Sequence, residues 1–242
     1  MSLKQAEILG VNVNSLTMVQ AVEKVQQFID ERKNALVATA NAEMLMRATQ
    51  DEELKHILNS ADLVVPDGAG TVWAANYLGV EMPERVAGYD LAQELMREAP
   101  GRGDRIYFFG SAPGVAESAR EKAMELYPGI KIVGTRNGFF SEADEPEIIA
   151  EIKAARPDIL LVALGVPKQE KWLYKYRQAL QVPVAIGVGG TLDVMAGVMQ
   201  RAPLWMQKAK LEWLFRGLKQ PSRAGRLLAL PKFVMKVMAS KK

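Results

Sequence analysis

Arg105-Ile-Tyr-Phe-Phe109 and Ile159-Leu-Leu-Val-Ala163 are two short apolar runs that decide the fold class of this chain of 242 residues. Neither run alternates apolar with polar residues, as a strand with one exposed face would. A helical pattern follows each of them, over residues 114–126 and 168–180. Apolar strands separated by helices predict an α/β fold, with a mostly parallel sheet covered by helices on both faces.

The same alternation extends over most of the chain. Further strands are expected at residues 35–39, 63–65, 131–133 and 184–187, each next to a helical pattern. The first helix is expected to begin at a cap on Ser15 and to end near Lys33. No repeat and no low-complexity linker interrupts the pattern. We therefore expect one domain over residues 1–195 and a second, helical unit over residues 196–242.

The composition excludes several kinds of site. The chain has no cysteine and a single histidine, His56, which lies in a helical stretch away from any strand end. Disulfides, thiolate nucleophiles and zinc sites built on cysteine or on several histidines are therefore excluded. Any acid–base chemistry is expected to depend on carboxylates.

The positive charge of the chain is concentrated at its end. Residues 208–242 hold ten Lys or Arg residues and one acid, Glu212, which gives this segment a net charge of +9. Because the whole chain carries +3, residues 1–207 carry −6. Such asymmetry predicts a polyanionic partner, which is a nucleic acid, an anionic membrane or a phosphorylated ligand.

The same segment is also apolar on one side. Leu214 and Phe215 fall on one helical face before Pro221, and Phe233 and Val237 resume that face after it. A basic amphipathic helix predicts contact of residues 204–242 with an anionic membrane surface. The alternative is a helix that packs on the body and leaves its lysines in solvent.

No targeting segment is evident in the sequence. The first residues lack the long apolar core of a signal peptide, and the most apolar long stretch, 182–199, contains Asp193 and four glycines. We expect a cytoplasmic protein whose contact with a membrane, if any, is peripheral.

Polar residues end or follow two of the expected strands. Thr39 and Asn41 close the first strand, and Asp67 follows the second. Ligands of doubly wound sheets bind beyond the carboxyl ends of the strands. Thr39 and Asn41 can hydrogen-bond a sugar or phosphate, or they can simply cap the next helix. Asp67 can act as a general base or bind a hydroxyl, although Pro-Asp-Gly is also a common turn.

Two later strand ends carry glycine turns. Gly110 begins a small-residue loop before a helix, where backbone N–H groups and the helix dipole favour a phosphate. The alternative there is a plain strand-to-helix turn. Gly165 follows the strand at 159–163, and the amide of Gln169 can reach a ligand in the same crevice.

Two charged residues complete the candidates. Asp193 follows the glycines at 187–190 and can hold a ribose hydroxyl or a base edge, or it can just start a helix. Arg85 can neutralise a diphosphate, or it can form a surface ion pair with a neighbouring acid.

In this order, the segments resemble the WecG/TagA/CpsF family, which is glycosyltransferase family 26, and the TagA branch most closely. The matching segments cover most of the chain, and seven of them in register are specific where each alone is weak. They are Thr39-Ala-Asn41-Ala-Glu43-Met44, Pro66-Asp67-Gly68, Glu84-Arg85-Val86-Ala-Gly88-Tyr-Asp90-Leu91, Phe109-Gly110 to Ala116, Gly165-Val-Pro167-Lys-Gln169-Glu170, Gly187-Val-Gly189-Gly190 to Gly197, and Arg201-Ala-Pro203-Leu-Trp205 through Glu212-Trp213 and Arg216.

The resemblance implies an inverting enzyme of cell-envelope polymer synthesis, with a Rossmann-like domain and a C-terminal appendage that contacts the inner face of the cell membrane. TagA-like members transfer N-acetylmannosamine from UDP-N-acetylmannosamine to N-acetylglucosamine on undecaprenyl diphosphate, which makes the linkage disaccharide of wall teichoic acid. WecG-like members instead use the uronic acid form of the donor, for enterobacterial common antigen, and this alternative stays open. The family is regarded as metal-independent, so the resemblance implies neither a metal nor a cofactor.

The resemblance also implies roles for residues of this chain. Asp67 is the candidate general base, and Arg85 is the candidate of the body for offsetting the charge of the leaving UDP. Asp193 is carried over for the nucleoside. Thr39, Asn41 and Gln169 match positions that line the sugar pocket, with Gly110 and Gly165 in the neighbouring turns. Arg216, Arg223 and Arg226 match arginines that the appendage is thought to bring over the active site.

Two other function classes fit the fold less well. A nicotinamide-dependent oxidoreductase would carry a glycine fingerprint after its first strand, where this chain has Thr39-Ala-Asn41. A nucleic-acid-binding protein would interleave stacking aromatics with the basic residues of its tail, and this tail does not. We therefore expect no nucleic-acid partner. A homo-oligomer that packs its exposed tails together is a further expectation.

Overall fold

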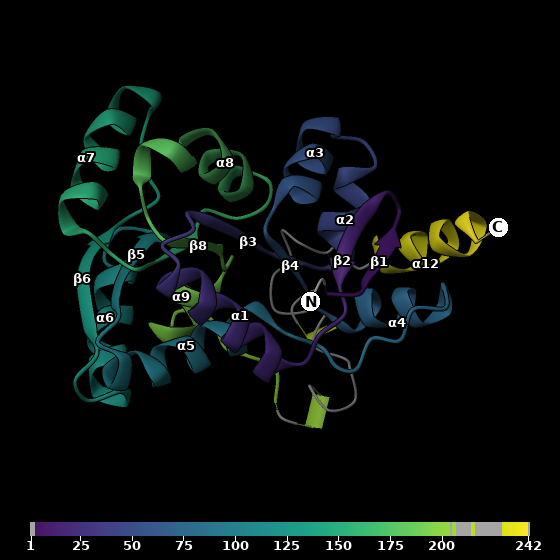
Figure 1. Cartoon of the computed structure of the whole chain (residues 1–242), viewed down its shortest axis with the longest axis horizontal. Helices are drawn as coiled ribbons and strands as arrows, with labels where there is room; N and C mark the ends of the chain where they lie inside the picture. Colours follow the sequence, from purple (N-terminus) through teal and green to yellow (C-terminus); the bar gives the residue numbers. More distant parts are fainter. Residues whose placement is uncertain (1–2, 204, 207–213, 216–228, 242) are drawn as a thin grey trace.

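The computed structural model describes residues 3–203, 205–206, 214–215 and 229–241. A six-stranded parallel sheet runs through it in the order β4-β3-β8-β7-β5-β6 (Figure 1). Its strands are β3 (Ala35–Ala40), β4 (Leu63–Pro66), β5 (Arg105–Gly110), β6 (Lys131–Arg136), β7 (Ile159–Ala163) and β8 (Val184–Gly187). The predicted parallel α/β sheet is thus confirmed.

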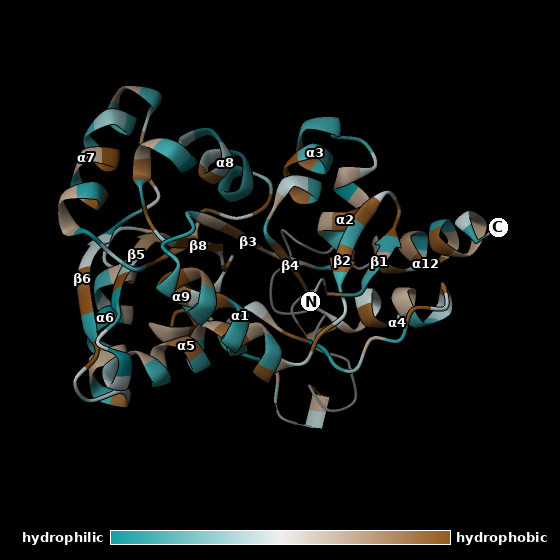
Figure 2. Ribbon diagram, in the orientation of Figure 1, coloured by the Kyte–Doolittle hydropathy of each residue, from teal (hydrophilic) through white to brown (hydrophobic). Residues whose placement is uncertain are grey.

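Helices cover both faces of this sheet. On one face lie α1 (Met18–Asp30), α5 (Gly88–Arg102), α6 (Val115–Leu126) and α9 (Thr191–Met195). On the other lie α7 (Glu145–Ala155), which follows a 3-10 turn at Glu142–Asp144, and α8 (Lys168–Leu180). In Figure 2 the central strands are largely brown, and the outward sides of the surrounding helices are largely teal.

The two covered faces explain why the strands are apolar throughout. In β5, Ile106 and Phe108 enter the core beneath α1, α5 and α6, whereas Tyr107 and Phe109 enter the core beneath α7 and α8. All four side chains are at most 1% exposed. Burial of each large apolar side chain contributes about 1.5–3 kcal/mol to folding. A polar residue at any of these positions would be buried, so the alternation typical of one-sided sheets does not occur.

A third apolar core lies beside the sheet and includes an antiparallel hairpin for which the sequence analysis made no prediction. The hairpin consists of β1 (Gln5–Ile8) and β2 (Val11–Asn14), joined by Leu9 and Gly10 in left-handed conformations. The helices α2 (Ala42–Ala48), α3 (Glu52–Ser60), α4 (Ala69–Tyr77) and α12 (Ala229–Ser240) pack into the same core. Asn14 attaches the hairpin to β4, because its Oδ1 accepts a hydrogen bond from the N–H of Val64 at 2.8 Å.

The first helix begins two residues later than predicted. Its cap is Thr17, whose hydroxyl accepts from the N–H of Gln20, while the side chain of Gln20 accepts from the N–H of Thr17. This reciprocal pair satisfies two N–H groups that would otherwise lack partners at the helix start. The predicted cap, Ser15, instead donates its hydroxyl to the carbonyl oxygen of Glu81 at 2.7 Å. The prediction of Ser15 as the cap was therefore wrong.

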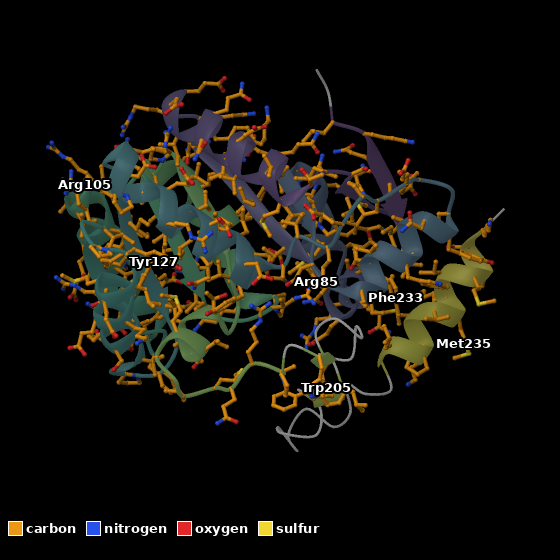
Figure 3. The ribbon with its side chains drawn as sticks, turned by 90° about the horizontal axis from the view of Figure 1, so that it is seen from below. Arg85, Arg105, Tyr127, Trp205, Phe233 and Met235 are labelled. Atoms are coloured by element: carbon orange, nitrogen blue, oxygen red, sulfur yellow. The ribbon has the colours of Figure 1, made fainter. Side chains whose placement is uncertain are left out.

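The end of the chain packs on the body. Phe233 and Val237 of α12 are fully buried against α2 and α4, whereas Met235, on the other side of the helix, is 62% exposed. Figure 3 shows Phe233 between α12 and α4, and Met235 on the outer side. For Phe233 and Val237 the expected membrane contact is wrong, because the body already covers them. None of the helices in the described parts of the chain is long and apolar enough to cross a membrane.

The boundary predicted at residue 195 remains a prediction. The structure nevertheless shows contacts between the two expected units, residues 1–195 and residues 196–242. Lys236 donates to the hydroxyl of Thr49 at 2.8 Å, and Lys241 donates to the carbonyl oxygen of Tyr77 at the same distance. Lys236 of α12 and Lys241, which follows it, are therefore held against the body as well as exposed to solvent.

Candidate active site

An open cleft lies at the carboxyl ends of β3, β4, β7 and β8, where the fold class places ligands. The space between its walls is about 600 Å³, which includes the part open to solvent. Its lining residues are Thr39, Asn41, Met44, Asp67, Tyr89, Val166, Gln169, Val188, Gly189, Gly190, Thr191, Val194, Met199 and Arg201. The structure thus brings together four of the predicted site residues, Thr39, Asn41, Asp67 and Gln169.

Thr39 and Asn41 lie at the end of β3, and both also hold the protein together. The Thr39 hydroxyl donates to the carbonyl oxygen of Gly187 at 2.9 Å, which links the ends of β3 and β8. Asn41 caps α2, because its Oδ1 accepts from the N–H of Met44 at 3.0 Å. The cap that was the alternative for Asn41 therefore exists, alongside its place in the cleft wall.

Asp67 lies directly after β4, on the opposite side of β3 from β8. Its backbone N–H donates to the carbonyl oxygen of Ala40 at 2.9 Å, so the turn is fixed to the end of β3. Gly68 follows with φ +107°, a conformation that favours glycine, and it leads into α4. The turn therefore places Asp67 in the lining of the cleft, together with Asn41.

Gln169 connects two of the glycine turns that surround the cleft. Its side chain is 1% exposed, and its Oε1 accepts from the N–H groups of Gly165 and Gly189, both at 3.1 Å. Its Nε2 donates to Oε1 of Glu170 at 2.7 Å. The amide predicted to reach a ligand is therefore engaged on both sides by the protein itself.

Four other predicted residues lie outside the lining of this cleft. Gly165 is adjacent to it and holds Gln169. Gly110 packs against β7, where an added Cβ would lie 2.4 Å from the carbonyl oxygen of Ala163, so contact between strands explains this glycine. Asp193 belongs to the first turn of α9 and accepts from the hydroxyl of Ser111 at 3.0 Å.

Arg85 is the fourth of these residues and lies in the segment between α4 and α5. The next residue, Val86, donates its N–H to the carbonyl oxygen of Pro66 at 3.0 Å, which places the segment alongside the turn of Asp67. In the view of Figure 3, Arg85 lies near the middle of the molecule. Arg216, Arg223 and Arg226, the arginines assigned to the appendage, lie outside the described residues.

Arg201, a basic residue of the cleft wall, was not among the predicted site residues. Arg201 lines the cleft and pairs with Asp90 in the first turn of α5, with N–O distances of 2.6 and 2.8 Å. Its guanidinium also lies 4.5 Å from the centre of the Tyr89 ring. Burial raises the pKa of the Tyr89 hydroxyl, so this group stays protonated at neutral pH. Arg201 is the first residue of the last matching segment, Arg201-Ala-Pro203 onwards, and this segment was the signal in the sequence that could have identified it.

Within the described residues, no group of three or more Asp, Glu or His side chains is arranged to hold a metal ion. The expectation that the reaction needs no metal stays a prediction.

Comparison with known proteins extends the sequence resemblance over the whole length of the chain. Residues 6–242 match the Glycosyl transferase WecG/TagA/CpsF family. A protein of Bacillus spizizenii is 37% identical over 211 residues, covering 87% of this chain and 81% of the relative. A protein of Bacillus subtilis is 34% identical over 232 residues, covering 96% and 89%.

A protein of Staphylococcus aureus strain MW2 is 32% identical over 240 residues, covering 98% of this chain and 94% of the relative. All three relatives are named N-acetylglucosaminyldiphosphoundecaprenol N-acetyl-beta-D-mannosaminyltransferase. By these matches along nearly its whole length, the chain belongs to the glycosyl transferase WecG/TagA/CpsF family.

Proposed function

We propose that this chain transfers N-acetylmannosamine from UDP-N-acetylmannosamine to N-acetylglucosamine on undecaprenyl diphosphate. Its curated relatives bear the name of this transferase, and they match nearly the whole chain. The same relatives favour this donor over the uronic acid form. One structural observation carries the proposal. A single cleft is lined by Asp67, by the polar residues at the carboxyl end of β3 and by the turn after β8.

In the proposed reaction, Asp67 is the general base. It takes the proton from the acceptor hydroxyl while the hydroxyl oxygen attacks the anomeric carbon, and the bond from that carbon to UDP breaks on the opposite face. Thr39 and Asn41 line the same cleft as Asp67 and offer hydroxyl and amide groups to a sugar. A positioned base of this kind contributes a factor of about 10² to 10⁴ in rate.

The leaving UDP carries negative charge that cationic groups have to offset. Arg85 lies in the segment that pairs with the end of β4, next to the turn of Asp67. Arg216, Arg223 and Arg226 are proposed to add charge from the appendage, in keeping with the +9 of residues 208–242. With these arginines offsetting the negative charge of the leaving UDP, the proposed reaction requires no metal ion.

We place the reaction at the inner face of the cell membrane, where a lipid-linked acceptor is available to a peripheral protein. The structure supports this proposal through exposed apolar side chains near the basic end of the chain. Trp205 is 65% exposed, and Met235 and Met238 on the outer side of α12 are exposed as well. Lys232, which is also exposed, lies on the same helix and supplies positive charge for an anionic surface.

The test is an assay of the purified full chain with a short-chain lipid carrying diphospho-N-acetylglucosamine. UDP-N-acetylmannosamine, its uronic acid form and UDP-N-acetylglucosamine are offered separately, and the products are weighed by mass spectrometry. We expect a disaccharide product with UDP-N-acetylmannosamine alone. A product only with the uronic acid donor would replace the proposed donor, and no product with any of the three would contradict the proposal.

A further inference from the structure

One buried acid at the cleft has no part in the proposed reaction. Glu170 lies in the first turn of α8 and is 2% exposed. Its Oε1 accepts the hydrogen bond from Gln169, and its Oε2 has no hydrogen-bond partner among the described residues. Burial raises the pKa of this carboxyl to about 7. A carboxyl held in so unfavourable a place is expected to serve a purpose that an apolar residue would not.

The neighbour of Glu170 has a determined orientation. Oε1 of Gln169 faces two backbone N–H groups, of Gly165 and Gly189, and N–H groups only donate. The atom that faces them therefore has to be the amide oxygen. It follows that the NH₂ group of Gln169 points the other way, towards Glu170, and needs an acceptor there.

The surroundings leave the amide no other position. An added Cβ on Gly187 would lie 2.6 Å from Nε2 of Gln169 and 3.1 Å from Oε1 of Glu170, so the two side chains fill the space beside β8. If the amide turned over, its NH₂ group would face two N–H donors and its oxygen would face the carboxyl. The contact between the amide oxygen and the carboxyl would be repulsive unless the carboxyl donated a proton. The contact between the NH₂ group and the two N–H groups would be repulsive in either case, because the two glycines would lack an acceptor.

The two glycines belong to the walls of the cleft. Gly189 lines it directly, and Gly165 is followed by Val166, which also lines it. Gly165 comes after β7 and Gly189 after β8, so the single oxygen of Gln169 joins two separate turns. The shape of this wall therefore depends on which way one amide faces.

We infer that Glu170 is a positioning residue for the transferase, because its buried carboxyl oxygen fixes the Gln169 amide that joins the Gly165 and Gly189 turns. The inference rests on the proposed function for its effect on turnover. It assigns Glu170 no contact with substrate. Misplacing a cleft wall by a fraction of an ångström to one ångström is enough to lower turnover by about tenfold to a hundredfold.

Two substitutions of Glu170 distinguish the effect of its carboxyl oxygen from the effect of its side-chain size. Glu170→Met keeps a similar volume but offers no oxygen, whereas Glu170→Gln offers an amide oxygen in the same place. We expect kcat/KM for the UDP-sugar to fall by about tenfold or more in Glu170→Met and to return to within about threefold of the unmodified chain in Glu170→Gln. Glu145→Gln is the matched control, since Glu145 is buried on α7 and accepts from Lys175 and Tyr176, away from the cleft.

A double-substitution cycle tests whether Glu170 acts through Gln169. If it does, Gln169→Ala combined with Glu170→Met will have the same kcat/KM as Gln169→Ala alone. Losses that multiply in the double variant would overturn the inference. Equal losses in Glu170→Gln and Glu170→Met would also overturn it, since the oxygen would then not be what matters.

Hydrogen exchange of single amides tests the inference without turnover. We expect the N–H groups of Gly165 and Gly189, followed by NMR, to exchange at least about tenfold faster in Glu170→Met and at the original rate in Glu170→Gln. Unchanged exchange in Glu170→Met would overturn the positioning role. If the unmodified chain shows no transfer but the exchange result holds, the proposed function fails and the positioning role stands.

Discussion

Two hydrogen bonds, of 2.6 and 2.8 Å, join the guanidinium of Arg201 to the carboxylate of Asp90. Asp90 stands in the first turn of α5, and Arg201 follows α9, so the pair connects segments 111 residues apart. Because Arg201 and Tyr89 both line the cleft, the pair holds one of its walls in place.

We predict that Arg201→Lys raises the KM for the UDP-sugar by about tenfold, because a lysine cannot form the two parallel hydrogen bonds of a guanidinium. The free energy of unfolding should fall by no more than about 1 kcal/mol, since the pair is partly exposed. Steady-state kinetics and urea unfolding measure the two effects. Arg97→Lys, which alters an exposed pair with Glu94, is the control and should change neither. An unchanged KM in Arg201→Lys would show that the pair does not shape the cleft.

Asp67→Asn should lower turnover by about 10² to 10⁴-fold, because an amide cannot take the proton of the acceptor hydroxyl. Binding of UDP, measured by calorimetry, should change little, since the side chain keeps its size and polarity. Asp30→Asn provides a surface control, as Asp30 pairs with Arg102 and is 63% exposed. Near-normal turnover of Asp67→Asn would exclude this carboxylate as the base.

The stability of the protein should depend on the ionisation of Glu170. The folded pKa of about 7 lies above the ordinary value of 4.5, so the folded state binds this proton more tightly than the unfolded state. The stability that the folded state gains by binding this proton is fully present below about pH 4.5, and it is lost as the pH rises through about 7. It amounts to roughly 3 kcal/mol.

Urea unfolding at pH 5 and pH 8 measures this dependence. Between these pH values, the unmodified chain should lose more stability than Glu170→Gln, which has no proton to release. The comparison cancels the other titrating groups, because both proteins share them. An identical pH dependence in the two proteins would mean that Glu170 ionises in the folded state as it does in water.

Phe233→Ala in α12 should lower the free energy of unfolding by about 3–5 kcal/mol, which is the usual cost of removing a fully buried aromatic ring. Met235→Ala, two residues away and 62% exposed, should change it by no more than about 0.5 kcal/mol. Urea unfolding distinguishes the two. Equal, small effects would mean that α12 does not stay on the body in solution.

Gly187→Ala should reduce activity and stability together, because the added methyl group would lie 2.6 Å from the Gln169 amide nitrogen. The expected loss of stability is about 1–3 kcal/mol. Gly101→Ala is the matched control, since a Cβ there meets nothing within 4 Å and lies in α5, where alanine is favoured by about 0.5–1 kcal/mol. Steady-state kinetics and thermal unfolding of both variants measure the losses of activity and stability. Equal effects of the two substitutions would contradict the prediction.

The parallel sheet was predictable because apolar runs such as residues 159–163, separated by helical patterns, are typical of strands covered on both faces. The hairpin at residues 5–14 escaped prediction because its turn, Leu9-Gly10, is not one of the Asn-Gly or Asp-Gly pairs that mark two-residue hairpin turns. Thr39, Asn41 and Asp67 were predictable as cleft residues from a rule of topology, since strand ends meet at one edge of a parallel sheet. Their chemical roles remain predictions.

Other features of the site depend on tertiary contacts that no local pattern encodes. Arg201 reaches the cleft because a segment 111 residues from Asp90 returns to α5. The burial of Glu170 follows from the packing of α8 beside Gly187, and the helix pattern alone shows only a polar residue near the start of a helix. Gly110 was expected near a phosphate, but its lack of a side chain is already required by the backbone of Ala163.

The position of α12 also has a consequence for how the protein is made. Phe233 and Val237 complete the apolar core that begins with Ala6 and Ile8, more than two hundred residues earlier in the chain. During synthesis from the N-terminus, the hairpin leaves the ribosome long before the helix that covers its core exists. Contacts at such a separation also form slowly. This core therefore stays uncovered until α12 has been made, and until then it is open to chaperones and to aggregation.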